Sequence, residues 1–267
     1  MQVLIIMNKR FKYFVASLFS ALGFFLFISL PYESRYFGLM VGVVLTVFCF
    51  WFGLGIIFEK SLYVRLMSVL LPVCFFVGFG MFAAFLPYDL WWAISMSLFF
   101  GIILYTLFLV ENVFLVAIGY KTVPLYRAAY TVSLIILLLS AFFLFDTLFS
   151  YSLGFLENGL GVFLISLLLF LYQFWSVAIE LPDDGANKNI WAYTVVPALM
   201  MGEMAAILSF WPTGIFKGSL YLVSFIYIIC NLIQAEIRDR LFKSVWLMYT
   251  YVAAAVILAM VVMTRWR

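Results

Sequence analysis

The chain has 267 residues, of which 68% are hydrophobic and 10% are charged, and its formal net charge is +3. A soluble domain carries about 45–50% apolar and about 25% charged residues, so this composition excludes a water-soluble globular protein. It also excludes a disordered chain, which requires low hydrophobicity and high net charge. The sequence therefore predicts a protein embedded in a membrane.

Nine apolar segments follow one another along the chain, and each approaches the roughly 20 residues that a transmembrane helix needs. The predicted spans are Phe14–Leu30, Tyr36–Ile57, Leu66–Phe85, Trp91–Glu111, Ala128–Phe149, Gly159–Ile179, Ile190–Phe210, Ile215–Gln234 and Val245–Thr264. These segments lack the alternating pattern of a membrane barrel. We therefore expect an all-α, polytopic transmembrane helical bundle with about nine spans, eight being the alternative. It forms a single integral-membrane domain over residues 1–267, without a sizeable extramembrane domain.

Lysine and arginine residues predict the orientation of the bundle, because cytoplasmic loops retain them. With nine spans and a cytoplasmic N-terminus, eleven of the fifteen lie on the cytoplasmic side: Lys9, Arg10, Lys12, Lys60, Arg65, Lys121, Arg127, Lys188, Arg238, Arg240 and Lys243. The outer side then holds Arg35, Lys217, Arg265 and Arg267. We expect the cytoplasmic membrane of a prokaryote as the location, with the lipid bilayer as the main partner.

The chain contains no histidine, which removes the commonest metal ligand and the usual general base. A Ser-His protease and an H-E-x-x-H metalloprotease are therefore impossible on this chain. The three cysteines, Cys49, Cys74 and Cys230, lie within apolar runs at no metal-ligand spacing. We expect no catalytic constellation, no metal site, no cofactor and no nucleic-acid partner.

Glu203 is the most informative residue, because it lies about 13 residues, or roughly 20 Å, into the seventh span. An ionisable group at such a depth costs about 2.5–3.5 kcal/mol on insertion scales, so we expect it to face protein or water. Pro197 precedes it and leaves the carbonyl group of Tyr193 without its helical donor, which favours a kink. A functional buried acid and a structural hydrogen-bonding tie are both consistent with this pattern.

Other polar residues inside the predicted spans complete the candidate site. Gln173 and Asn231, in the sixth and eighth spans, are possible companions of Glu203, and hydrogen bonds between helices also explain them. Further polar positions lie near the ends of the fourth and fifth spans: Glu111, Asn112 and Asp146. Aromatic residues make up 21% of the chain, with 32 phenylalanines. They form either a surface for lipid and partner subunits or filler between helices.

Three functions follow from these patterns. The first is a non-enzymatic membrane subunit that packs against other membrane proteins or organises an envelope complex, because the loops are short and no catalytic constellation is present. The second is a small transporter or ion-coupled carrier built around Glu203. The third is a metal-dependent lipid-modifying enzyme that uses Asp183 and Asp184, although Pro-Asp-Asp-Gly is also ordinary turn chemistry.

Overall fold

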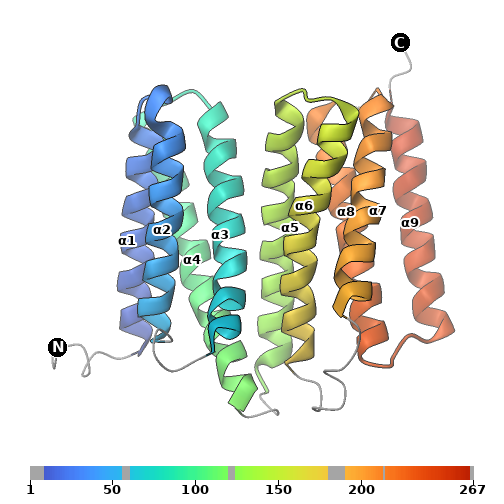
Figure 1. Ribbon diagram of the computed structural model, residues 1–267, viewed down its shortest axis with the longest axis horizontal. Coiled ribbons are helices and arrows are strands. Elements are labelled where there is room, and N and C mark those ends of the chain that lie inside the picture. Colours follow the sequence, from blue (N-terminus) through green and yellow to red (C-terminus); the bar gives the residue numbers. More distant parts are fainter. Residues whose placement is uncertain (1–8, 56–60, 120–123, 180–189, 213, 265–267) are drawn as a thin grey trace. The chain divides into compact units, whose positions relative to one another are not determined.

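The structure, a computed structural model, describes residues 9–55, 61–119, 124–179, 190–212 and 214–264. These residues form nine α-helices and one short 3-10 helix, and each α-helix is long and apolar enough to cross a membrane (Figure 1). The elements are α1 (Lys9–Ser29), η2 (Tyr32–Ser34), α2 (Arg35–Leu54), α3 (Leu62–Phe85), α4 (Leu90–Gly119), α5 (Tyr126–Ser150), α6 (Phe155–Ala178), α7 (Ile190–Phe210), α8 (Ile215–Ile237) and α9 (Lys243–Met263). The predicted all-α bundle is confirmed, and the protein is an integral membrane protein.

Several helices extend beyond the predicted spans. Helix α4 continues past Glu111 to Gly119, a continuation that the sequence of residues 112–119 allows. Helix α6 begins at Phe155, because its first turn is capped locally: the backbone N–H of Gly154 donates to Oε2 of Glu157 over 3.1 Å. An acidic residue in the first turn satisfies free N–H groups and interacts favourably with the helix dipole. Polar residues at this helix start therefore belong to the helix and not to the preceding loop.

The chain divides into two compact units, residues 1–136 and 137–267, with the boundary inside α5. In the first unit, α1 lies against α2, α3 and α4. Its core is a cluster of phenylalanine rings: Phe24, Phe27, Phe75, Phe76, Phe79 and Phe100. The rings of Phe24 and Phe100 stack with their centroids 4.3 Å apart. These six phenylalanines fill space between helices. The single integral-membrane domain expected from the sequence stays a prediction.

In the second unit, α6 and α7 approach each other closely enough for their backbones to touch. A Cβ atom added at Gly202 would lie 2.9 Å from the carbonyl oxygen of Gly159, and one added at Gly159 would lie 3.1 Å from that of Gly202. Small residues permit such approaches, which replace the hydrophobic driving force that is missing between helices in lipid. Helix α8 contacts α6, α7 and α9, whereas most residues of α9 are exposed.

The two predicted outer-loop cations are bound to the carboxyl ends of helices. Nη1 of Arg35 donates to the carbonyl oxygen of Ala84, near the end of α3, over 2.6 Å, and its Nε donates to that of Leu30, after α1, over 3.4 Å. Nζ of Lys217 donates to the carbonyl oxygen of Met263, the last residue of α9, over 3.3 Å. Cations stabilise helix C-termini, where carbonyl groups lack intrahelical donors. These contacts give both residues a structural reason to lie on the predicted outer side.

Replacing Arg35 with alanine is expected to lower the free energy of unfolding by about 1.5–3 kcal/mol, the range for hydrogen bonds to charged groups. Arg35→Lys retains the charge but not the several donors of the guanidinium group. We therefore expect a loss of unfolding free energy between zero and that of the alanine variant. The unfolding of both variants in mild detergent, monitored by circular dichroism, measures these losses of stability. Arg10, which is exposed on α1, supplies the matched control, and Arg10→Ala is expected to change stability by less than about 0.5 kcal/mol. Equal effects of the two alanine substitutions would contradict the capping role.

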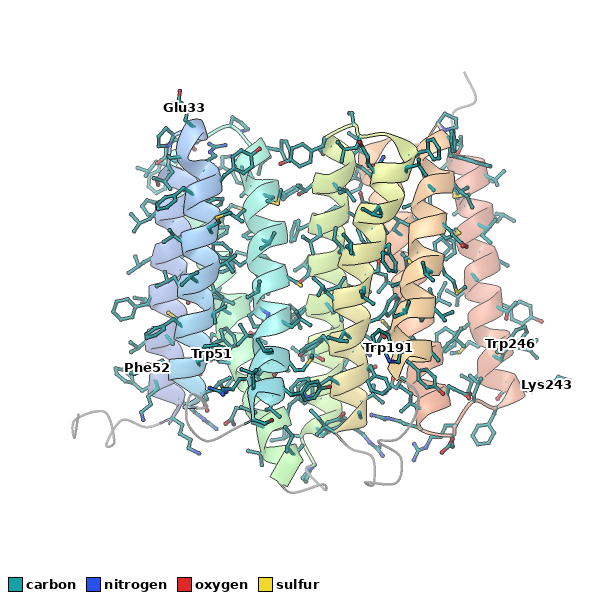
Figure 2. The ribbon with its side chains drawn as sticks, viewed as in Figure 1. Glu33, Trp51, Phe52, Trp191, Lys243 and Trp246 are labelled. Atoms are coloured by element: carbon teal, nitrogen blue, oxygen red, sulfur yellow. The ribbon has the colours of Figure 1, made fainter. Side chains whose placement is uncertain are left out.

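Tryptophans mark one end of the second unit. Trp191 and Trp246 lie in the first turns of α7 and α9, and Figure 2 shows both at the same end of that unit, together with Lys243. Both indole rings are exposed. Exposed tryptophan and lysine side chains at one level are typical of a membrane–water interface. That this end faces the cytoplasm stays a prediction.

Candidate functional site

Glu203 lies 13 residues after the start of α7, or about 20 Å along its axis. Its side chain is exposed, and among the described residues its carboxyl group has no hydrogen-bond or ion-pair partner. The sequence predicts that this acid faces protein or water, and the structure places it on the exposed surface of α7, outside the core of this chain. Its role as a functional group stays a prediction.

The burial of the other faces of α7 explains why Glu203 points outward. Met201 and Ala205, two residues to either side of Glu203, are fully buried. At 100° per residue they project about 160° away from Glu203. Gly202, which meets Gly159 of α6, projects about 100° to one side of the acid. The most buried residues of α7 thus lie opposite the acid, and α6 packs to one side of it.

The predicted companions of Glu203 do not gather around it. Because Gly202 contacts Gly159, Glu203 lies at the level of the first turns of α6. Gln173 is buried in α6, 14 residues further along, which corresponds to about 21 Å. The structure therefore separates Gln173 from Glu203 along the helix axis.

Asn231 and Pro197 also have local roles. Nδ2 of the half-buried Asn231 donates to the carbonyl oxygen of Tyr227 in its own helix, over 2.7 Å. Pro197 is buried, and α7 continues through it without a break. The four residues of the predicted buried site are thus distributed over three helices and do not form one pocket.

The remaining candidates lie on separate elements. Glu111 is completely buried in α4, and the next residue, Asn112, accepts a hydrogen bond from the hydroxyl of Tyr13 over 2.8 Å, which ties α4 to α1. Asp146 is half-buried near the end of α5. Asp183 and Asp184 lie outside the described residues. Within the described ranges, no three Cys, Asp or Glu side chains come together as metal ligands.

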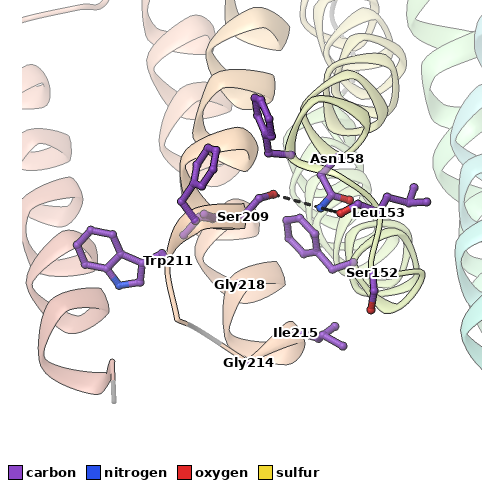
Figure 3. A pocket seen from close by; sticks show the side chains of 12 residues that line it. Ser152, Leu153, Asn158, Ser209, Trp211, Gly214, Ile215 and Gly218 are labelled. Atoms are coloured by element: carbon purple, nitrogen blue, oxygen red, sulfur yellow. Dashed lines mark hydrogen bonds between the residues drawn. The ribbon is translucent and has the colours of Figure 1, made fainter. Parts of the chain in front are cut away.

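A cavity of about 370 Å³ opens at one end of the second unit, where α5 and α7 end and α6 and α8 begin (Figure 3). It is lined by Phe149, Ser152, Leu153, Phe155, Asn158, Leu208, Ser209, Phe210, Trp211, Gly214, Ile215 and Gly218. Nδ2 of Asn158 donates to Oγ of Ser209 over 3.1 Å and to the carbonyl oxygen of Leu153 over 3.2 Å. The lining carries no charged side chain, so the cavity can hold water or neutral groups.

The sequence analysis did not select Asn158 or Ser209. Asn158 is only 6% exposed, and its hydrogen bond to Ser209 joins α6 to α7 near the Gly159–Gly202 contact. Asn158 lies one residue before the predicted sixth span, which begins at Gly159. The structure includes it in α6, whose cap at Gly154 lies four residues earlier.

Residues 59–263 match a family described as "Protein of unknown function (DUF5656)". The match begins before α3, ends with α9 and includes Glu203. No curated protein and no solved structure matches the chain. The function must therefore be argued from the geometry of the molecule.

Proposed function

The chain belongs to this family of unknown function, and we propose that it is a non-enzymatic membrane subunit that packs laterally against another transmembrane helix. The exposure of Glu203 on the outward face of α7 supports this proposal. A lone chain in a bilayer would present this carboxyl group to lipid, and an ionisable group in hydrocarbon is costly unless it is paired.

The position of Glu203 limits its access to water. It precedes Phe210, the last residue of α7, by seven residues, or about 10 Å. Side chains in a helix tilt toward the N-terminus, so that of Glu203 leans away from the nearer end of α7. Glutamate is also too short to span such a distance as lysine and arginine do when they reach the interface. A contact with another helix is therefore the more favourable environment for this group.

The required partner is a transmembrane helix that carries a hydrogen-bond donor at the depth of Glu203. Hydrogen bonds between membrane helices contribute about 1–2 kcal/mol in model peptides and about 0.6 kcal/mol on average in a natural bundle. Such bonds offset part of the insertion cost of about 2.5–3.5 kcal/mol. The exposed apolar residues around Glu203, Leu199, Met200 and Ile207, would supply the packing contacts.

The carrier alternative needs a polar pathway around the same acid. Gln173 lies about 21 Å away along the helix axis and Asn231 bonds to its own helix, so the described residues do not supply one. No observation favours this second function over the packing subunit.

The native mass of the protein in its own membrane tests the proposal. Particles cut from the membrane with their lipid are expected to carry an assembly larger than the 30.7 kDa chain. Glu203→Ala is expected to shift at least about half of the protein to the mass of the lone chain, because it removes the hydrogen bonds that hold the partner. Leu258→Ala, on the exposed surface of α9, is the control and should leave the mass unchanged. Recovery of the wild-type protein as a lone chain would overturn the proposal.

A further inference from the structure

We propose that the partner helix at α7 is α7 of a second copy of this chain, arranged as a parallel, two-fold symmetric dimer. This inference rests on the proposed function, since it names the partner of the same surface. It depends on two observations: the spacing of the exposed residues on α7 and the chemistry of the one acid among them.

The outward face of α7 has the spacing of a coiled-coil seam. Five exposed residues follow one another at intervals of four, three, four and three: Val196, Met200, Glu203, Ile207 and Phe210. We call this set the α7 seam. A 4-3-4-3 spacing keeps one stripe facing a parallel neighbour over several turns, with side chains packing into the gaps of the partner helix. The α7 seam is therefore shaped for a second helix of the same kind.

Most of the α7 seam is exposed and can receive that helix, because α6 packs to one side of it; at the end of the seam the ring of Phe210 also contacts that of Phe155 on α6, with the centroids 4.9 Å apart. The contact between Gly202 and Gly159 fixes α6 at that side. Glu203 is the central residue of the α7 seam and the only polar one. A single polar residue in an apolar seam sets the register and the number of helices, since any other alignment leaves it facing apolar side chains.

Two-fold symmetry supplies Glu203 with a matching partner at the correct depth. An axis along the membrane normal brings each residue of the α7 seam opposite its own equivalent, so the two Glu203 carboxyl groups meet. A carboxyl group that holds a proton is both donor and acceptor, so the pair satisfies its own hydrogen bonds.

Cysteine cross-linking of purified protein in vesicles of synthetic phosphatidylcholine and phosphatidylglycerol tests the dimer, because only copies of this chain are present. Met200→Cys and Ile207→Cys place thiols in the α7 seam and leave Glu203 intact. Cys49 is replaced by alanine, while the buried Cys74 and Cys230 are retained because they cannot reach another copy. Both variants are expected to form a disulfide-linked species of twice 30.7 kDa upon oxidation.

Two controls separate a specific dimer from random collision. Leu258→Cys lies on α9, is 66% exposed, and is expected to cross-link at least about tenfold less, the ratio that about 1.4 kcal/mol of pairing energy produces. Adding E203A to Ile207→Cys is expected to lower the cross-linked fraction about tenfold. Adding E203Q to Ile207→Cys should keep the cross-linked fraction within about twofold, because an amide also donates and accepts hydrogen bonds.

The outcomes distinguish this inference from the proposed function. Cross-linking at both positions of the α7 seam, lost in E203A and retained in E203Q, supports the dimer. If the two seam variants cross-link no more than Leu258→Cys does, the dimer is overturned. If the native membrane then still yields an assembly that depends on Glu203, the proposed function stands with a different partner. If the native assembly is also absent, both proposals fail.

Discussion

Replacing Gly202 with leucine is expected to prevent α6 and α7 from packing and to abolish recovery of folded protein from the membrane. Even alanine is too large here, because its Cβ atom would lie 2.9 Å from the carbonyl oxygen of Gly159 and 3.0 Å from Cβ of Phe163. Neither atom belongs to a flexible side-chain end, so the helices must move apart. Overpacking of this kind costs about 1–3 kcal/mol for a methyl group, and more for a larger side chain.

Gly161→Ala is the matched control on α6. A Cβ atom there would meet only the terminal methyl groups of Leu148, at 2.8 and 3.0 Å, and that side chain can rotate away. Alanine also favours the helix over glycine by about 1 kcal/mol, so we expect this variant to be neutral or more stable. Thermal unfolding in mild detergent compares Gly202→Ala with Gly161→Ala. Equal melting temperatures would show that the α6–α7 contact is looser than the structure has it.

Replacing Phe100 with alanine is expected to destabilise the first unit by about 2–4 kcal/mol. In water-soluble proteins this substitution costs about 3–5 kcal/mol, part of which is the transfer of the ring from water. That part is small here, because lipid tails are as apolar as the protein interior. What remains is the cavity left beside the rings of Phe24, Phe75 and Phe79, whose centroids lie 4.3, 5.7 and 6.4 Å from that of Phe100.

Phe48→Ala provides the comparison for Phe100→Ala, because Phe48 is 62% exposed on α2 and Phe100 is fully buried. The same atoms are deleted, but no cavity forms, so we expect a change below about 0.5 kcal/mol. Equilibrium unfolding of the two variants by denaturant in detergent gives the difference directly. A similar loss for both would mean that the phenylalanine cluster contributes no more than a lipid-facing ring.

The fold could be predicted from the sequence because hydrocarbon imposes few choices on a backbone. Residues 155–178 show where this reasoning stops: the helix begins four residues before its predicted span, since a cap extends a helix without apolar residues. Arg35 and Lys217 were counted only as exceptions to the charge distribution. Their hydrogen bonds to helix ends became visible only in three dimensions.

The candidate site shows the same division. Glu203 could be singled out from the sequence, because a charged residue at that depth of an apolar run is rare and costly. Whether its side chain points toward the protein or away from it could not be predicted. All faces of α7 are apolar, so the face that packs inward depends on which neighbouring helix lies closest. The proximity of Asn158 to Ser209 likewise depends on the register of two helices, about 50 residues apart in the chain.

Composition and hydropathy alone predict a membrane protein with about nine spans, because the bilayer requires length and apolarity from every span. The described residues contain nine helices that are long and apolar enough to cross a membrane. Which face of each helix meets protein is a different question, and in lipid hydrophobicity cannot answer it. Here the answer came from close packing: Gly159 and Gly202 bring α6 and α7 together, and the burial of Met201 and Ala205 leaves Glu203 on the exposed face of α7.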